Sequence, residues 1–118
     1  IVEDDPIMGE SLLQRLSLEG GTVRWWRDGA RAAREVAGFR PDIIICDMRL
    51  PHITGEDVFR QTSDRITAPF LFITGYAERA TVRSEFLGQG MEMIAKPFAI
   101  DVLSAKIREM IEAPAPAA

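Results

Sequence analysis

The chain has 118 residues, of which 47% are hydrophobic, and its 14 basic and 18 acidic residues give a formal net charge of −4. This length predicts one domain with enough apolar material for a core. The apolar runs are far shorter than the roughly 18 residues that a membrane-spanning helix needs. The acidic balance argues against a nucleic-acid-binding face built on surplus basic charge.

The cysteine content and the start of the chain bear on location. Cys46 is the single cysteine, which excludes an internal disulfide and a Cys-based zinc cluster. No basic leader followed by an apolar segment is visible, so no secretion signal is predicted. We therefore expect a cytoplasmic protein.

The first forty residues alternate short apolar runs with helical patterns. The predicted elements are a strand end at 1–2 whose upstream part is missing, a helix at 6–19, a polar edge strand at 22–26 and a helix at 28–37. Pro6 suits a first helical turn, Asp28 suits an N-cap, and Gly38 is a stop signal.

The rest of the chain continues the same alternation. The predicted elements are strands at 43–46, 70–73 and 91–95, helices at 55–62, 77–87 and 99–112, and a Pro/Ala tail or linker at 113–118. Near-continuous apolar strands separated by helices are typical of a parallel sheet buried on both faces. We expect an α/β domain over 1–112, with a doubly wound parallel sheet of five strands and helices on both faces.

Polar residues follow the predicted strands, at the edge where open α/β sheets bind ligands. They are Glu3, Asp4 and Asp5 after the first strand, Asp47 after the third, Thr74 after the fourth and Lys96 after the fifth. Converging carboxylates repel by about 1 kcal/mol per pair even in water. An oxygen-only ligand set favours a hard cation such as Mg²⁺, and a nearby lysine suits a phosphate.

Each feature also has an ordinary interpretation. The acidic triplet alone suggests a solvated turn or a helix N-terminal cluster, and Asp47 alone could cap a turn. Their shared position at strand ends favours a site. His52, the single histidine, lies in a predicted loop and gives little support for a Ser-His-Asp mechanism. Cys46 is expected in the core, and Trp25 and Trp26 on opposite sides of their strand.

Four motifs in this order cover essentially the whole chain. They are Val-Glu-Asp-Asp-Pro at 2–6, Pro-Asp-Ile-Ile-Ile-Cys-Asp-Met-Arg-Leu-Pro at 41–51, Phe-Ile-Thr-Gly at 72–75 and Lys-Pro-Phe at 96–98. With these separations the chain resembles the receiver domain of two-component response regulators. The resemblance implies a flavodoxin-like fold with strand order 2-1-3-4-5, and Mg²⁺-dependent phosphorylation by a histidine kinase.

The resemblance also implies a role for each site residue. Asp47 would be the phosphoacceptor, and Thr74 and Lys96 would bind phosphoryl oxygens, with a cis peptide bond between residues 96 and 97. The implied Mg²⁺ ligands are Asp4 directly, Glu3 through water, Asp47 and the backbone carbonyl of Arg49. Asp5 would lie just outside this set.

Three further positions are expected to modulate the site. Arg49 and Tyr76 would flank the phosphoryl group and slow its hydrolysis. Met93 stands where receivers often carry a tyrosine or phenylalanine whose ring moves on activation. A flexible thioether makes a weaker two-position switch than a ring, so we expect altered signalling.

The main hypothesis is a signalling receiver, not an enzyme, that switches a partner-binding or dimerisation face formed by 78–89, 91–95 and 99–112. Its partners would be a sensor histidine kinase or a phosphotransfer protein and, for a homodimer, a second copy. No nucleic acid or membrane partner is expected. One alternative is a receiver-like interaction module that signals independently of phosphate. Another is a small phosphohydrolase, which is disfavoured because Arg49 stands where a second aspartate would be needed.

Overall fold

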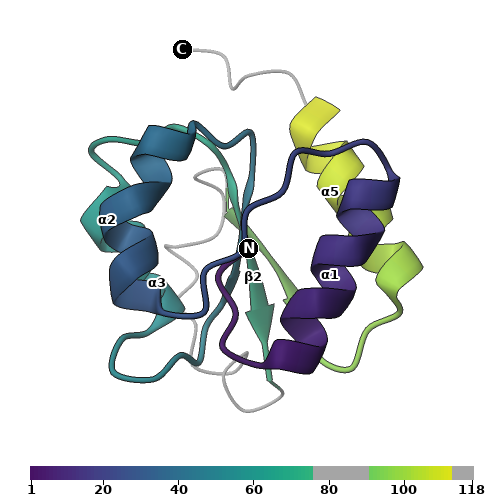
Figure 1. Ribbon diagram of the computed structural model, residues 1–118, viewed down its shortest axis with the longest axis horizontal. Helices are drawn as coiled ribbons and strands as arrows, with labels where there is room; N and C mark the ends of the chain where they lie inside the picture. The colour runs from purple at the N-terminus through teal and green to yellow at the C-terminus, as the bar shows by residue number, and fades with distance from the viewer. Residues whose placement is uncertain (76–90, 113–118) are drawn as a thin grey trace.

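The computed structural model describes residues 1–75 and 91–112, and its centre is a parallel β-sheet (Figure 1). Three strands form it in the order β1 (Ile44–Asp47), β2 (Phe70–Thr74) and β3 (Met91–Ala95). In the register, Cys46 pairs with Phe72, and Phe72 pairs with Met93. The three buried strands predicted from apolar runs are confirmed to within one residue at each end.

The first two predicted strands meet the sheet through single bridges. Val2 bridges Trp26 on one side and Cys46 on the other, both in parallel. The 22–26 segment was predicted as a strand; of these residues Trp26 alone makes a bridge, so a full strand there is not confirmed. Hydrogen bonds join the two segments here: Trp26 N–H donates to Ile1 O at 2.8 Å, and Glu3 N–H donates to Trp26 O at 3.0 Å.

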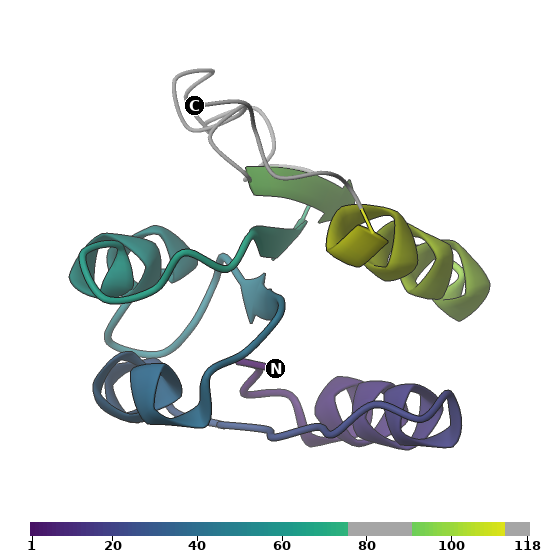
Figure 2. The same cartoon turned by 90° about the horizontal axis from the view of Figure 1, so that it is seen from above.

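Helices cover both faces of the sheet, as Figure 2 shows. They are α1 (Pro6–Leu18), α2 (Gly29–Phe39), α3 (Gly55–Thr62) and α5 (Ile100–Glu112). One face carries α2 and α3, and the other carries α1 and α5. Each face has its own apolar cluster, with Trp26 and Phe72 in the first and Leu12 and Leu71 in the second. The three-layer arrangement is confirmed for these elements.

Short polar side chains begin the first three helices. Asp5 accepts from Ile7 N–H at 3.0 Å, and Asp28 accepts from Ala30 N–H at 3.0 Å, so each satisfies an otherwise unpaired amide. Thr54 and Asp57 form a reciprocal capping box at α3. These caps fix where each helix begins relative to the strand end before it. Within the described residues, no helix has the length and apolar character needed to cross a membrane.

The end of α2 differs from the prediction. Gly38 was expected to stop this helix, but α2 continues through it to Phe39. Arg40 takes the left-handed conformation, with φ of 56°, and Pro41 then prevents the helix from continuing. The predicted helix at 77–87 and the tail at 113–118 lie outside the described residues.

Gly55 sets the distance between α3 and the end of β1. A Cβ atom there would lie 2.5 Å from the backbone oxygen of Asp47 and 2.9 Å from the Cα atom of Met48. The clash would be with backbone, which cannot rotate away as a flexible side chain can. Glycine at this position therefore allows α3 to start directly beside Asp47.

Two glycine substitutions test this packing in opposite directions. Gly55→Ala should lower the free energy of unfolding by about 1–3 kcal/mol through overpacking. Gly38→Ala should raise it by about 0.5 kcal/mol, because a Cβ there meets nothing within 4 Å and alanine favours the helix. Urea unfolding of both variants gives the values. Equal effects of the two substitutions would contradict the packing argument.

Candidate functional site

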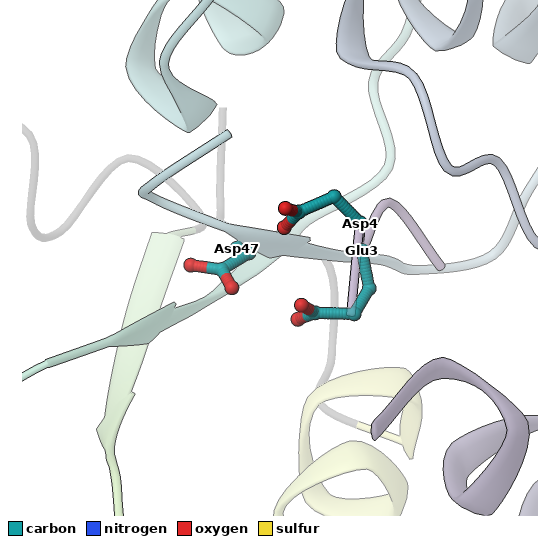
Figure 3. A group of neighbouring side chains, drawn as sticks. All are labelled: Glu3, Asp4 and Asp47. Carbon is teal, nitrogen blue, oxygen red and sulfur yellow. The ribbon is translucent and has the colours of Figure 1, made fainter. Parts of the chain in front are cut away.

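A group of acidic side chains lies at the carboxyl edge of the sheet. Glu3 and Asp4 directly follow the bridging residue Val2, and Asp47 ends β1. Figure 3 shows their three carboxylates beside the end of that strand. One oxygen from each lies within 4.8 Å of the others. The predicted convergence of these acids is confirmed.

Asp47 is fixed by two donors while it is 4% exposed. Its Oδ1 accepts from the backbone N–H of Arg49 at 2.9 Å, and its Oδ2 accepts from Lys96 Nζ at 3.1 Å. Lys96 follows β3, so this strand brings a positive charge to the carboxylates at the site. A buried carboxylate is tolerated only when paired in this way.

Glu3 is the most deeply buried acid, with 1% of its surface exposed. Its Oε1 accepts from the backbone N–H of Asp5 at 3.1 Å, whereas its Oε2 is buried and has no hydrogen-bond partner within residues 1–75 and 91–112. Burial raises the pKa of Glu3 to about 8, and the neighbouring Asp47 carboxylate adds to the rise. A negative charge on Glu3 is therefore costly unless a further cation accompanies it.

Thr74 and Lys96 complete the edge. Thr74 ends β2, is fully buried, and its Oγ1 has no hydrogen-bond partner among the described residues. Partial burial opposes the charge of Lys96, but the hydrogen bond and negative charge of Asp47 outweigh it and raise the lysine pKa. The peptide bond between Lys96 and Pro97 is cis, as the resemblance implied.

The donor set fits a hard divalent cation. All three candidate ligands are carboxylates, and Mg²⁺ prefers oxygen donors and usually keeps several waters. Glu3 Oε2 is a candidate ligand oxygen. It is buried, and no hydrogen bond from the described residues offsets the cost of its burial. A cation beside these acids would lower the cost of keeping Glu3 ionised.

Other predicted positions have different surroundings. Asp5 serves as the N-cap of α1, His52 is exposed with φ of 67°, and Cys46 is a fully buried core residue. Met93 is half-buried and packs against the core cluster that contains Phe72. Tyr76 and the 78–89 part of the predicted switching face lie outside the described residues.

The family model of the response regulator receiver domain matches residues 1–108 of the chain. The chain belongs to this family. Receivers are the signalling domains of two-component systems, and phosphorylation and magnesium are typical of them. The fold of this receiver, an α/β layer structure with a parallel sheet, is that of its family.

Relatives from bacteria agree with this assignment. Response regulator MprA of Mycobacterium ulcerans (strain Agy99) is 34% identical over 115 residues, which cover 94% of this chain and 48% of that protein. Response regulator protein PmrA of Pseudomonas aeruginosa PAO1 is 30% identical over 112 residues, covering 93% of this chain and 50% of that protein. The receiver thus spans about half the length of these curated relatives.

Solved receivers share its shape. The non-phosphorylated HemR receiver domain of Leptospira biflexa matches with a TM-score of 0.82 and 30% identity, over 99% of this chain and 95% of that one. The receiver domain of a sensor histidine kinase from Pseudomonas aeruginosa PAO1 matches with a TM-score of 0.79 and 27% identity, over 95% and 94% of the two chains. That structure has a magnesium ion coordinated in its active-site cleft.

One contact to the site was not predicted from the sequence. The indole Nε1–H of Trp25 donates to the backbone carbonyl of Glu3 at 2.8 Å. Trp25 and Trp26 do pack in opposite apolar clusters, as the alternation predicted. The sequence did not indicate this contact because it does not show how closely Gly9 of α1 approaches this side of the sheet.

The raised pKa of Glu3 predicts a pH-dependent stability difference. Between pH 4.5 and about 8, the unfolded state loses the Glu3 proton while the folded state keeps it, so this residue destabilises the receiver increasingly as pH rises. Glu3→Gln removes the penalty. Without Mg²⁺, its stability gain over wild type should grow from near zero below pH 4.5 to about 5 kcal/mol above pH 8. Urea unfolding across this pH range measures it, and a pH-independent difference would contradict the assignment.

Proposed function

We propose that this receiver accepts a phosphoryl group on Asp47 from a phosphohistidine donor, and that phosphorylation switches a partner-binding face. The observation that supports it most strongly is the environment of Asp47. This buried carboxylate contacts Lys96, lies beside two further acids and sits at a strand-end edge that also carries a buried, unpartnered hydroxyl. Few structural roles need all of these groups together.

The chemistry is an in-line displacement. An Asp47 carboxylate oxygen attacks phosphorus, a P–O bond forms, and the P–N bond to the donor imidazole breaks with its electron pair leaving on nitrogen. The products are an acyl phosphate on Asp47 and a neutral donor imidazole, because the phosphoimidazole reacts protonated on its other ring nitrogen. We propose that Lys96 then moves from Asp47 Oδ2 to a phosphoryl oxygen, and that Thr74 Oγ1 donates to another.

The acids hold the cofactor in this scheme. We propose that Asp4 and Asp47 bind Mg²⁺ directly, that Glu3 binds it through water, and that the backbone carbonyl of Arg49 contributes another oxygen. When bound, Mg²⁺ neutralises carboxylate and phosphoryl charge, which is the principal need of phosphoryl transfer. The buried Glu3 oxygen without a partner supports this assignment.

The output is proposed to be a change of binding face. We propose that 78–89, 91–95 and 99–112 form a surface for an effector or a second copy, coupled to Thr74 through Met93. The half-buried Met93 side chain packs against the core, where a flexible thioether can adjust its shape. A sensor histidine kinase or phosphotransfer protein would supply the phosphoryl group in the cytoplasm.

We further propose that residues 1–112 form the receiver, with five strands in the order 2-1-3-4-5 when numbered along the chain, and that 113–118 form a tail or linker. The Val2 bridges to Trp26 and Cys46 support this order, because they put the first segment between the second and β1. The receiver-like interaction module independent of phosphate is less favoured. Such a module would not need Glu3 and Asp47 to be buried together, nor a Glu3 Oε2 that lacks a hydrogen bond among the described residues.

Phosphorylation can be tested by intact mass. After incubation with Mg²⁺ and acetyl phosphate, the wild-type protein should gain one phosphoryl group. Asp47→Asn should gain none because it lacks the nucleophile. Wild-type protein with a chelator should gain none because it lacks the cation. Asp57→Asn is a matched control outside the site, since Asp57 belongs to the α3 capping box. An adduct that persists in Asp47→Asn, or none in folded wild-type protein, would refute the proposal.

The side chains of Arg49 and Tyr76 are predicted to lengthen the life of the phosphoryl group by hindering water. Arg49→Ala and Tyr76→Ala should each speed loss of the adduct about 3-fold, equivalent to a barrier change of about 0.6 kcal/mol. The decay is followed by mass after the phosphodonor is removed. Decay rates equal to wild type in both variants would show that neither side chain shields the site.

A further inference from the structure

We infer that Trp25 is a positioning residue that holds the acidic segment, residues 3–5, so that its carboxylates converge on Asp47. This inference rests on the proposed phosphoacceptor function and adds a residue to it that lies outside the four motifs. Trp25 touches a backbone carbonyl, so it acts through the acids and contacts no reacting atom.

The contact holds Glu3 at the point where the chain leaves the sheet. The Trp25 indole donates to Glu3 O at 2.8 Å, and the Glu3 N–H donates to Trp26 O at 3.0 Å. In a regular parallel ladder, the next donor to Glu3 O would be the backbone N–H of Asp28. Asp28 instead begins α2 as its N-cap, and the Trp25 side chain supplies the hydrogen bond at this carbonyl.

Gly9 makes room for the indole. A Cβ atom at Gly9 would lie 2.2 Å from both Cε2 and Cζ2 of Trp25, and 2.6 Å from its Nε1. The ring therefore lies directly against the backbone of α1, which begins just after the acidic segment. Asp5 fixes one end of the segment as the helix N-cap, and Trp25 fixes the other end at Glu3.

Arg27 adds a second restraint from the same stretch of chain. Its Nη2 donates to Asp4 O over a long 3.5 Å, and its guanidinium carbon lies 5.8 Å from the centre of the Trp25 ring. Such a cation–ring contact is weakly attractive at an exposed site. Two consecutive carbonyls of the acidic segment thus receive donors from side chains two residues apart.

This arrangement matters because the carboxylates repel one another. Three acidic oxygens within 4.8 Å tend to separate unless their backbone is held. Mg²⁺ demands near-ideal octahedral geometry, so a looser acidic segment must be reordered each time the ion binds. Trp25 and Gly9 fix that segment before binding.

The test measures Mg²⁺ affinity by calorimetry in the unphosphorylated protein, at a temperature where every variant is folded. Trp25→Phe keeps an aromatic ring but removes the N–H, and should weaken Mg²⁺ binding about fivefold, the effect of one hydrogen bond. Gly9→Ala should weaken it by displacing the same ring. Trp26→Phe is the matched control, because the Trp26 indole donates to the Glu35 carboxylate instead, at 3.4 Å. Its Mg²⁺ affinity should equal that of wild type.

Tryptophan emission gives a second readout that a purely structural role would not change. The chain has two tryptophans, so Trp26→Phe leaves Trp25 as the sole emitter and Trp25→Phe leaves Trp26. Mg²⁺ should change the emission of the Trp25-only protein more than that of the Trp26-only protein. Thermal unfolding of each variant separates loss of stability from loss of affinity.

The outcomes separate this inference from the proposed function. If wild type binds Mg²⁺ and Trp25→Phe binds it equally well, the positioning role is wrong and the phosphoacceptor proposal stands. If folded wild type binds no Mg²⁺, the phosphoacceptor proposal fails and the role of Trp25 fails with it. Weaker binding in Trp25→Phe and Gly9→Ala, with Trp26→Phe unchanged, supports the inference.

Discussion

The mutual repulsion of three carboxylates at the carboxyl edge of the sheet is the constraint that organises this receiver. Glu3 and Asp47 are almost fully buried, so water cannot screen them well. Lys96 reaches Asp47 from the end of β3 and supplies one compensating charge. The raised pKa of Glu3 shows that this compensation is incomplete, because burial still disfavours the charged form. A divalent cation is the simplest group that would complete it.

Close backbone approach lets the surrounding elements meet this constraint. Gly55 allows α3 to begin beside the backbone of Asp47, and Gly29 allows α2 to begin where a Cβ would lie 2.6 Å from Ile53. Gly9 lets the Trp25 ring lie on α1. A methyl group would clash with backbone at Gly55, and with a packed side chain at Gly29 and at Gly9. The acids are therefore kept together by the close packing of elements around them as well as by their own hydrogen bonds.

The sequence predicted the three strands of the described sheet, the starts of the first three helices and the converging acids because each depends on local patterns. Apolar runs marked β1, β2 and β3, and Asp28 marked the start of α2. It could not predict that α2 would pass through Gly38, since a glycine in the helix is tolerated when the next residues provide the stop. Nor could it predict the Trp25 contact, which depends on how α1 lies against the sheet. Long-range packing decided the Trp25 contact, whereas the residues after Gly38 decided the end of α2.

The groups at the site differ in how firmly the fold holds them. Asp5 fixes the start of α1. Glu19 follows the end of α1 and accepts a hydrogen bond from Ser104 of α5 at 2.6 Å. The acidic segment therefore precedes a helix that is fixed at both ends. Asp47 is held by the Arg49 amide beside the Gly55 contact. By contrast, the Lys96 side chain is 35% exposed and Thr74 Oγ1 has no partner. The ligands proposed for the cation are thus rigidly placed, whereas the groups proposed for the phosphoryl oxygens retain bonding capacity. This division suits a site that must bind an ion before it responds to phosphorylation.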